Sequence, residues 1–150
     1  IMVEAIFENK ITVDKFIGDA VMANFGTPKS YGNDAQNAFD CAVAMNLKLE
    51  NLNKKREQTN QFKIEHRIGI HYGKCVVGNM GSKQRVEFAV IGDTVNVASR
   101  ICSACKEFDT NFLISDELAQ MINYDLPSTT VSNYLIRGRN EPLDLIKIYQ

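Results

Sequence analysis

The segment from residue 87 to residue 102 constrains this chain more than any other stretch. An apolar, β-prone run is followed by Gly92 and Asp93, a turn that opens a helix, and we expect Asp93 to cap that helix. Asn96 and Arg100 are four positions apart in the helix, so their side chains share one face. A neutral hydrogen-bonding group beside a permanent cation suits a phosphorylated ligand.

Length and composition predict one well-filled core. The chain has 150 residues, 45% of them hydrophobic, and its character does not shift along its length, so we expect a single domain over residues 1–150. A formal net charge of −1 provides no general basic field for a nucleic acid. No apolar run approaches the ~20 residues that span a bilayer, and the N-terminus lacks signal-peptide features. A cytoplasmic location is expected, with membrane attachment of a longer parent protein left open.

The cysteines and histidines show no metal-binding pattern. Cys102 and Cys105 form a C-x-x-C pair, but no second ligand pair lies at a zinc-site spacing, so we expect reduced thiols that serve packing. The same expectation covers Cys41 and Cys75. The two histidines lie near the ends of one predicted strand without ligand spacing, and a structural role is expected for both, His66 and His71.

Hydrophobic periodicity predicts an α+β fold. Helices and strands alternate without the regular βαβ spacing of a doubly wound sheet, and we expect a sheet with helices on one face. Asp19 is expected at the tip of the first hairpin. A loop over residues 79–85 is expected to join two strands, and the segment 78–86 around it is either an arm toward a partner or a plain exposed hairpin. The expected strands are residues 11–17, 20–25, 64–71, 75–78, 86–91, 112–114, 129–136 and 143–149. The expected helices are residues 1–8, a long helix from Asp34 that fades over 53–61, residues 94–106, and a short helix capped by Ser115.

Four segments in a fixed order carry a family resemblance. They are KFIGDAVMA from Lys15, RIGIHYGKCVVGNMG from Arg67, FAVIGDTVNVASR from Phe88, and the turn Arg137-Gly-Arg139. This ordered set resembles the class III adenylate and guanylate cyclase catalytic domain over nearly the whole chain. The resemblance implies a ferredoxin-like core, two such domains paired head to tail, and a substrate held between them. It also places the family's first strand upstream of residue 1, so the domain is expected to be incomplete at its N-terminus.

The resemblance implies catalytic and metal-binding roles. In this family two aspartates hold two divalent ions, Mg²⁺ or Mn²⁺; Asp19 matches one, and the other belongs to the upstream strand. Asn96 and Arg100 match the pair that orients the ribose and stabilises the transition state. The alternatives are ordinary ones: a turn-stabilising role for Asp19, and solvated helix positions for Asn96 and Arg100.

The resemblance also implies substrate-binding roles. Lys15 matches a position that contacts the base, and an ammonium group, which only donates, suits the ring-nitrogen acceptor of adenine. Its partner position is Ala89, where family adenylate cyclases usually have Asp or Thr, so base selection is expected to be looser. Arg137 and Arg139 lie in the turn that supplies a cation to the triphosphate, with Lys74 as a weaker candidate; either arginine could also be a plain exposed turn residue.

Three functions follow from the resemblance. The first is a homodimeric adenylate cyclase domain that makes cyclic AMP and pyrophosphate from ATP, attached to a regulatory or sensor domain elsewhere in its parent. The second is a guanylate or dual-specificity cyclase, which Ala89 allows. The third is a noncatalytic module for nucleotide binding or dimerisation. Nucleic acid is not an expected partner.

The metal-binding expectation yields a first prediction. Residues 1–150 assayed alone should show little cyclase turnover, because only one of the two implied metal-binding aspartates is present. A form extended upstream to include the second aspartate should be active. Comparing cyclic nucleotide production by the two forms tests this, and strong turnover by the short form would contradict it.

Overall fold

The computed structural model describes residues 12–82 and 85–150, and the helix expected over residues 1–8 lies outside them. The helices are α2 (Asp34–Gln58), α3 (Asp93–Glu107) and α4 (Asp116–Ala119). The strands are β1 (Thr12–Ile17), β2 (Ala20–Asn24), β3 (Ile68–Ile70), β4 (Val76–Ser82), β5 (Arg85–Ile91), β6 (Phe112–Ser115), β7 (Ser128–Tyr134) and β8 (Leu143–Ile148). This mixed content confirms the α+β class.

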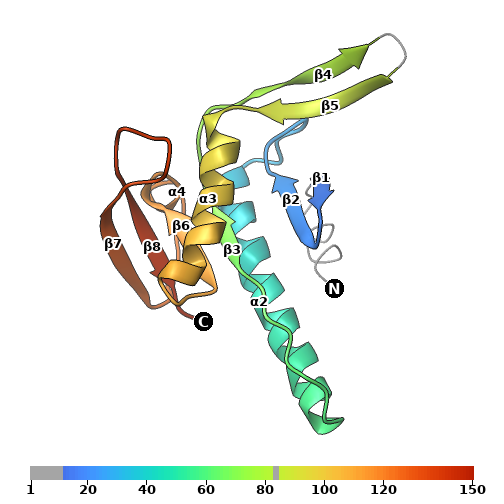
Figure 1. The fold of residues 1–150 in the computed structure, drawn as a ribbon, viewed down its shortest axis with the longest axis vertical. Helices are drawn as coiled ribbons and strands as arrows, with labels where there is room; N and C mark the ends of the chain where they lie inside the picture. The colour runs from blue at the N-terminus through green and yellow to red at the C-terminus, as the bar shows by residue number, and fades with distance from the viewer. Residues whose placement is uncertain (1–11, 83–84) are drawn as a thin grey trace.

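The centre of the molecule is a four-stranded sheet in the order β3-β6-β8-β7 (Figure 1). β3 runs parallel to β6, whereas β6–β8 and β8–β7 are antiparallel pairs. The remaining described strands form two separate hairpins, β1–β2 and β4–β5. In Figure 1 the β4–β5 hairpin projects from one end of the molecule, and the β1–β2 hairpin lies on the other side of α2 from the sheet.

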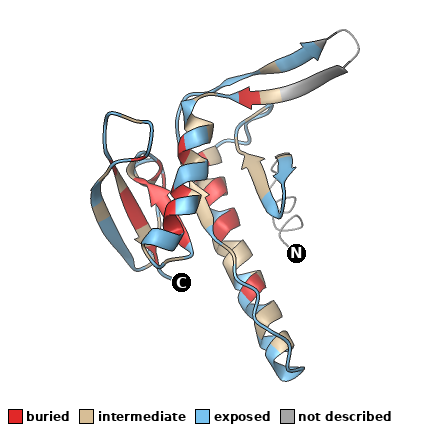
Figure 2. Cartoon of the chain, viewed as in Figure 1, coloured by how far each residue is buried: buried red, intermediate tan, exposed pale blue. Residues whose placement is uncertain are grey.

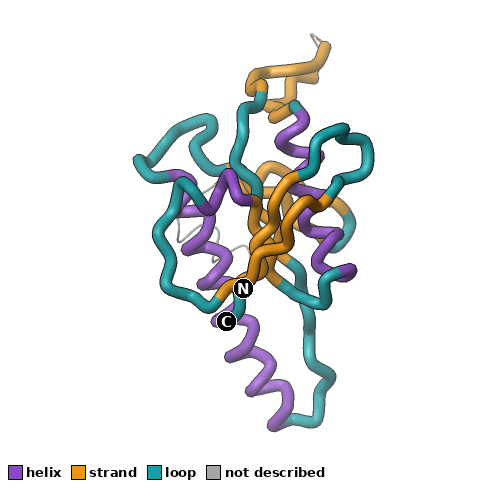
Figure 3. Tube along the Cα trace, turned by 90° about the vertical axis from the view of Figure 1, so that its left-hand side faces the viewer, coloured by secondary structure: helices purple, strands orange, loops and turns teal. Residues whose placement is uncertain are grey.

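Helices cover both faces of this sheet, so the expectation of helices on one face is wrong. Alternate residues of a strand point to opposite faces, and on β6 both sets are apolar: Phe112 and Ile114 pack with α2 and α4, whereas Leu113 packs with α3. Figure 3 shows helices on both sides of the central strands, and Figure 2 shows the buried residues gathered there. A sheet that is apolar on both faces needs a helix on each.

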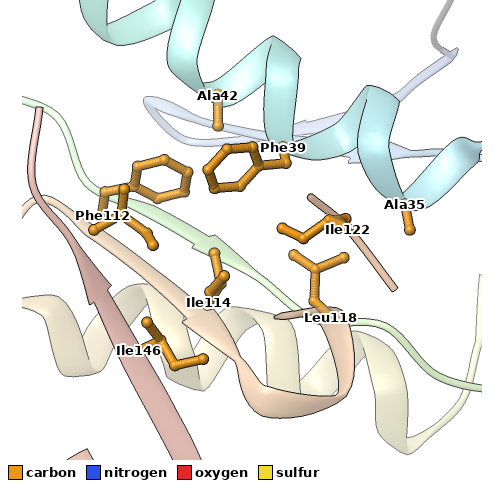
Figure 4. Close-up of a cluster of buried hydrophobic side chains, with 9 residues drawn as sticks. Ala35, Phe39, Ala42, Phe112, Ile114, Leu118, Ile122 and Ile146 are labelled. Carbon is orange, nitrogen blue, oxygen red and sulfur yellow. The ribbon is translucent and has the colours of Figure 1, made fainter. Parts of the chain in front are cut away.

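The core on the α2 side is built from aromatic and aliphatic side chains (Figure 4). The rings of Phe39 and Phe112 stack with centroids 5.6 Å apart. α2 begins where expected, because the Asn33 side chain accepts a hydrogen bond from the Gln36 amide at 3.1 Å and caps the helix. The helix continues to Gln58 rather than fading over its charged stretch, so that its far end extends beyond the sheet.

The strand expected over residues 64–71 is shorter in the structure. Only Ile68–Ile70 joins the sheet, and the preceding segment is held by side chains of α2. Asn53 bonds the backbone of Ile64 in both directions, at 2.8 and 2.9 Å, and the Arg56 side chain donates to the Phe62 carbonyl at 2.8 Å. These bonds satisfy backbone groups that a strand would otherwise pair.

The β4–β5 hairpin is longer than expected. The loop expected over residues 79–85 is largely strand, with register pairs running from Val76↔Ile91 to Ser82↔Arg85. Val76, Val77 and Met80 are all exposed on it. An exposed apolar hairpin of this kind is a surface that another chain can cover.

Gly69 sets how closely β3 approaches α3. A β-carbon built at Gly69 would lie 2.2 Å from the Cys102 nitrogen and 2.6 Å from its α-carbon, both backbone atoms that cannot rotate away. Gly69→Ala should therefore lower the free energy of unfolding by about 2 kcal/mol or more. The matched control is Gly78→Ala, where a β-carbon meets nothing within 4 Å. Urea unfolding of the two variants tests this, and equal stability would contradict it.

Candidate active site

The exposed face of α3 carries the polar residues singled out in the sequence. Asp93, Asn96 and Arg100 are exposed, whereas Val97 and Ile101 on the opposite face are buried in the core. Gly92 occupies the N-cap position, and no side chain bonds the first turn there, so the expected capping role of Asp93 is wrong. The Asp93 carboxylate is instead available to a neighbouring loop.

That neighbour is the turn between β7 and β8. The Arg100 guanidinium donates a hydrogen bond to the Arg137 carbonyl, and Arg139 Nε lies 3.4 Å from Asp93 Oδ2. Gly138 has a φ of +87°, which favours glycine, and a β-carbon on it would lie 3.5 Å from Arg100 Nη2. The turn therefore contacts the exposed face of α3 at two points, one at the start of the helix and one near its middle.

This arrangement gathers positive charge. Arg100 bonds the backbone of Arg137 in the turn, and Arg139 of the same turn pairs with the Asp93 carboxylate, so three arginines belong to this one contact. In the described part of the chain, neither the Arg137 guanidinium nor the Asn96 amide has a polar partner, whereas Arg139 is paired with Asp93. Guanidinium groups bind phosphate oxygens in bidentate fashion, so the surface can receive a polyanion with Arg137 as its unengaged cation.

A buried histidine lies behind this surface. His71 Nδ1 is 2.8 Å from Ser115 Oγ and 3.9 Å from Glu117 Oε2, with only 7% of the side chain exposed. Ser115 also caps α4 as expected, accepting from the Leu118 amide at 3.3 Å. Burial lowers the pKa of His71; the negative charge of Glu117 opposes this and the positive charge of Arg139 adds to it. His71 is thus part of the structure beneath the arginine turn.

The connection after His71 is fastened to the start of α3. Thr94 Oγ1 donates a hydrogen bond to the Lys74 carbonyl. A β-carbon built at Gly73 would lie 2.7 Å from this Thr94 hydroxyl oxygen. Sequence reasoning missed Thr94, although its position just after a Gly-Asp turn is typical of a side chain that bonds nearby backbone. The Lys74 side chain is exposed and has no polar partner among the described residues.

The β1–β2 hairpin holds Lys15 and Asp19. Ile17 pairs with Ala20, which leaves Gly18 and Asp19 as a two-residue turn, and Gly18 has the left-handed φ of +62° that such turns use. Asp19 is exposed at the tip, as expected. The hairpin and the sheet lie on different sides of α2 in Figure 1, and among the described residues no hydrogen bond or ion pair joins Lys15 or Asp19 to the exposed face of α3.

Ala89 lies in β5 directly opposite Gly78. Neither residue has a polar side chain, so this part of the hairpin offers a base no side-chain hydrogen bond. Of the two positions that the family resemblance assigns to the base, Lys15 and Ala89, only Lys15 has a polar side chain.

The thiols act as packing groups. Cys102 and Cys105 donate to the Arg67 and Ile68 carbonyls, both at 3.4 Å. Burial raises the pKa of Cys105 to about 12 and that of Cys41 to about 11, so both thiols stay protonated near neutral pH. Across residues 12–82 and 85–150, no three His, Cys, Asp or Glu side chains gather as a metal-binding group. No helix in these ranges has the length and apolar character to cross a membrane.

Comparisons with known proteins identify the family and the fold. A family model described as the adenylate and guanylate cyclase catalytic domain matches residues 2–149. Adenylate cyclase 1 of Rhizobium meliloti is 30% identical over 145 residues, which make up 97% of this chain and 22% of that protein. The crystal structure of the adenylyl cyclase CyaB from P. aeruginosa has a TM-score of 0.85 at 29% identity, covering 99% of this chain and 76% of that one. The guanylyl cyclase Cya2 has a TM-score of 0.81 at 30% identity, covering 98% and 74%.

The family match and the similar structures define a domain of the nucleotide cyclase type. The chain belongs to the family of adenylate and guanylate cyclase catalytic domains. It spans about a fifth of the length of the Rhizobium relative.

The two partly buried histidines predict a pH dependence of stability. Burial lowers the folded-state pKa of both His66 and His71 below the ordinary value of 6.5, so the unfolded chain takes up protons first as the pH falls. The free energy of unfolding should therefore decrease from about pH 7 to about pH 5, by at most about 1.4 kcal/mol per pH unit for each histidine. His71→Asn should flatten this dependence, and the double variant with His66→Asn should flatten it further. An unchanged slope in the double variant would contradict the assignment.

Proposed function

We propose that this chain is the catalytic domain of an adenylate cyclase, which converts ATP into 3′,5′-cyclic AMP and pyrophosphate in a site shared by two copies. The observation that carries the proposal is the exposed face of α3 with the arginine turn against it. Asn96 and Arg100 project from one helix face, and the turn brings Arg137 and Arg139 to the same surface. This is a binding surface for a nucleoside triphosphate.

In the proposed reaction the ribose 3′-hydroxyl oxygen bonds to the α-phosphorus while the bond from that phosphorus to the bridging oxygen breaks. The hydroxyl proton is released and pyrophosphate carries away the electron pair. Asn96 orients the ribose through its amide. Arg100 stabilises the charge that develops on the α-phosphate, after exchanging its bond to the Arg137 carbonyl for one to the substrate.

The two turn arginines have different tasks in this proposal. Arg137 holds the leaving pyrophosphate, because its guanidinium has no other polar partner among the described residues. Arg139 is engaged with Asp93 and fastens the turn to α3. This difference in pairing is what supports the division of roles between the two arginines.

Asp19 is the proposed metal-binding residue of the described chain. Mg²⁺ is usually held through one or two carboxylates together with substrate phosphates, and the exposed Asp19 carboxylate fits one of these places. The family's two divalent ions would activate the 3′-hydroxyl and neutralise the leaving group. Asp19 supplies a single carboxylate, in keeping with a site completed by other groups.

Two copies of the domain would complete the site. The β1–β2 hairpin and the exposed face of α3 lie apart in one chain (Figure 1). A head-to-tail pair would bring Asp19 of one copy to Lys15, Asn96 and Arg100 of the other. The exposed apolar residues of the hairpins, among them Phe16 and Val76, suit such an interface.

A second candidate function is a guanylate or dual-specificity cyclase. Ala89 lies opposite Gly78 and offers no acceptor for the adenine amino group, so Lys15 alone favours ATP. A relative of known structure, Cya2, is named a guanylyl cyclase. Relative turnover of ATP and GTP decides between the two candidates.

The upstream-extended form, incubated with manganese and either nucleotide, should produce cyclic AMP from ATP faster than cyclic GMP from GTP. Arg100→Ala should lower kcat by about 10³-fold or more while KM changes much less, because its interaction is strongest in the transition state. Lys106→Ala is the matched control, since Lys106 is an exposed cation in the last turn of the same helix and should leave both constants unchanged. Chromatographic identification of the product gives the readout. No cyclic product from either nucleotide, or a raised KM with kcat unchanged in Arg100→Ala, would contradict the proposal.

A further inference from the structure

We propose that Asp14 is a positioning residue that holds the Lys15 ammonium group and thereby sets the preference of the site for ATP over GTP. The inference rests on the proposed function, because it assigns Lys15 to the base. It concerns a residue that the sequence pattern did not single out, and it follows from an irregularity in β1.

Adjacent side chains of a regular strand point to opposite faces. β1 is irregular at this point: Val13 pairs with Ala23 and Lys15 pairs with Met22, so Asp14 has no partner in the register. This is the two-against-one arrangement of a β-bulge, which re-aims side chains and is frequent beside active sites. As a result, Asp14 Oδ2 lies 3.5 Å from Lys15 Nζ, although the residues are neighbours in sequence.

The burial of the two side chains is unequal. Only 4% of the Asp14 side chain is exposed, against 53% for Lys15. Asp14 Oδ2 is fully covered and accepts no hydrogen bond, so the nearby Lys15 charge is its one favourable interaction among the described polar groups. A buried carboxylate oxygen without a hydrogen bond is unfavourable for folding. Here the buried Asp14 carboxylate attracts the half-exposed Lys15 ammonium group on its inner side. The outer side of the ammonium group stays open to a ligand.

Ala89 makes this restraint matter for specificity. With no polar side chain at Ala89 or at the opposite Gly78, the direction of the Lys15 ammonium decides which purine is accepted. A lysine side chain is long and flexible, and an unrestrained ammonium can move from the adenine ring nitrogen to the oxygen acceptor of guanine. The fixed charge of Asp14 limits this movement.

The test uses Asp14→Asn, which keeps the shape and removes the charge, in the upstream-extended form. Glu50→Gln is the matched control: Glu50 pairs with Lys54 at 2.7 Å, but both side chains are about 60% exposed on α2. Asp14→Asn should lower kcat/KM for ATP by about 10-fold, mainly through KM, and leave kcat/KM for GTP nearly unchanged. Its thermal midpoint should be equal to or above that of the parent. Glu50→Gln should alter neither ratio.

Two further measurements separate positioning from a structural role and from failure of the proposed function. In a Lys15→Ala background, Asp14→Asn should have no additional effect on the ATP to GTP ratio, because the group that Asp14 positions is gone. Binding of fluorescent ATP and GTP analogues gives a readout without turnover: a Kd shift for ATP alone in Asp14→Asn upholds the inference even if no cyclic product forms. Equal losses for both nucleotides, a lower thermal midpoint, an additive double variant, or no binding of either analogue to the parent would each overturn it.

Discussion

The packing of α3 on the central sheet is the constraint on which the rest of the site depends. Val97 and Ile101 pack against Leu113 and Leu145, and Gly69 lets β3 come within backbone contact of the helix. Fixing one face of a helix fixes the opposite face as well. Asp93 and Arg100 are therefore directed to the β7–β8 turn by the core on the other side of the helix. Because β8 contributes to the same core, the arginine turn and the helix it contacts share one rigid base.

Within one chain, this base carries the arginine-rich face but not Asp19, the residue proposed to bind metal (Figure 1). The arginine-rich face can bind a polyanion, but the carboxylate that would hold a cation is on a hairpin with its own small core around Cys41. In the proposed head-to-tail pair, the Asp19 carboxylate of one copy would meet the arginine-rich face of the other, and association would then be a condition of activity. The exposed apolar hairpin residues are consistent with this division, since a monomer gains nothing from presenting them to water.

The sequence predicted most of the elements and the positions of Asn96 and Arg100 on one helix face, because periodicity and spacing are local properties. It did not predict features decided by distant residues. The segment before Ile68 resembles a strand, but Asn53 and Arg56 of α2 bind its backbone instead. Asp93 looks like a cap, yet the ion pair with Arg139, 46 positions away, determines its place. The continuous apolar run of β6 is explained by α2 and α4 packing on one of its faces and α3 on the other, an arrangement that local spacing does not specify.

The bulge at Asp14 shows why such a feature escapes sequence analysis while still bearing on function. Strand periodicity assigns Asp14 and Lys15 to opposite faces, and only the register brings the two charges within 3.5 Å. Burying a carboxylate costs folding free energy that a neutral residue of similar shape would not, so stability alone does not favour aspartate here. The Lys15 ammonium group is restrained on its buried side and exposed on the other. Such a group suits a site in which the cation must approach its ligand from one fixed direction. If Lys15 and Ala89 face the base as proposed, Ala89 offers no second polar contact, and the orientation of the Lys15 ammonium would be what distinguishes adenine from guanine.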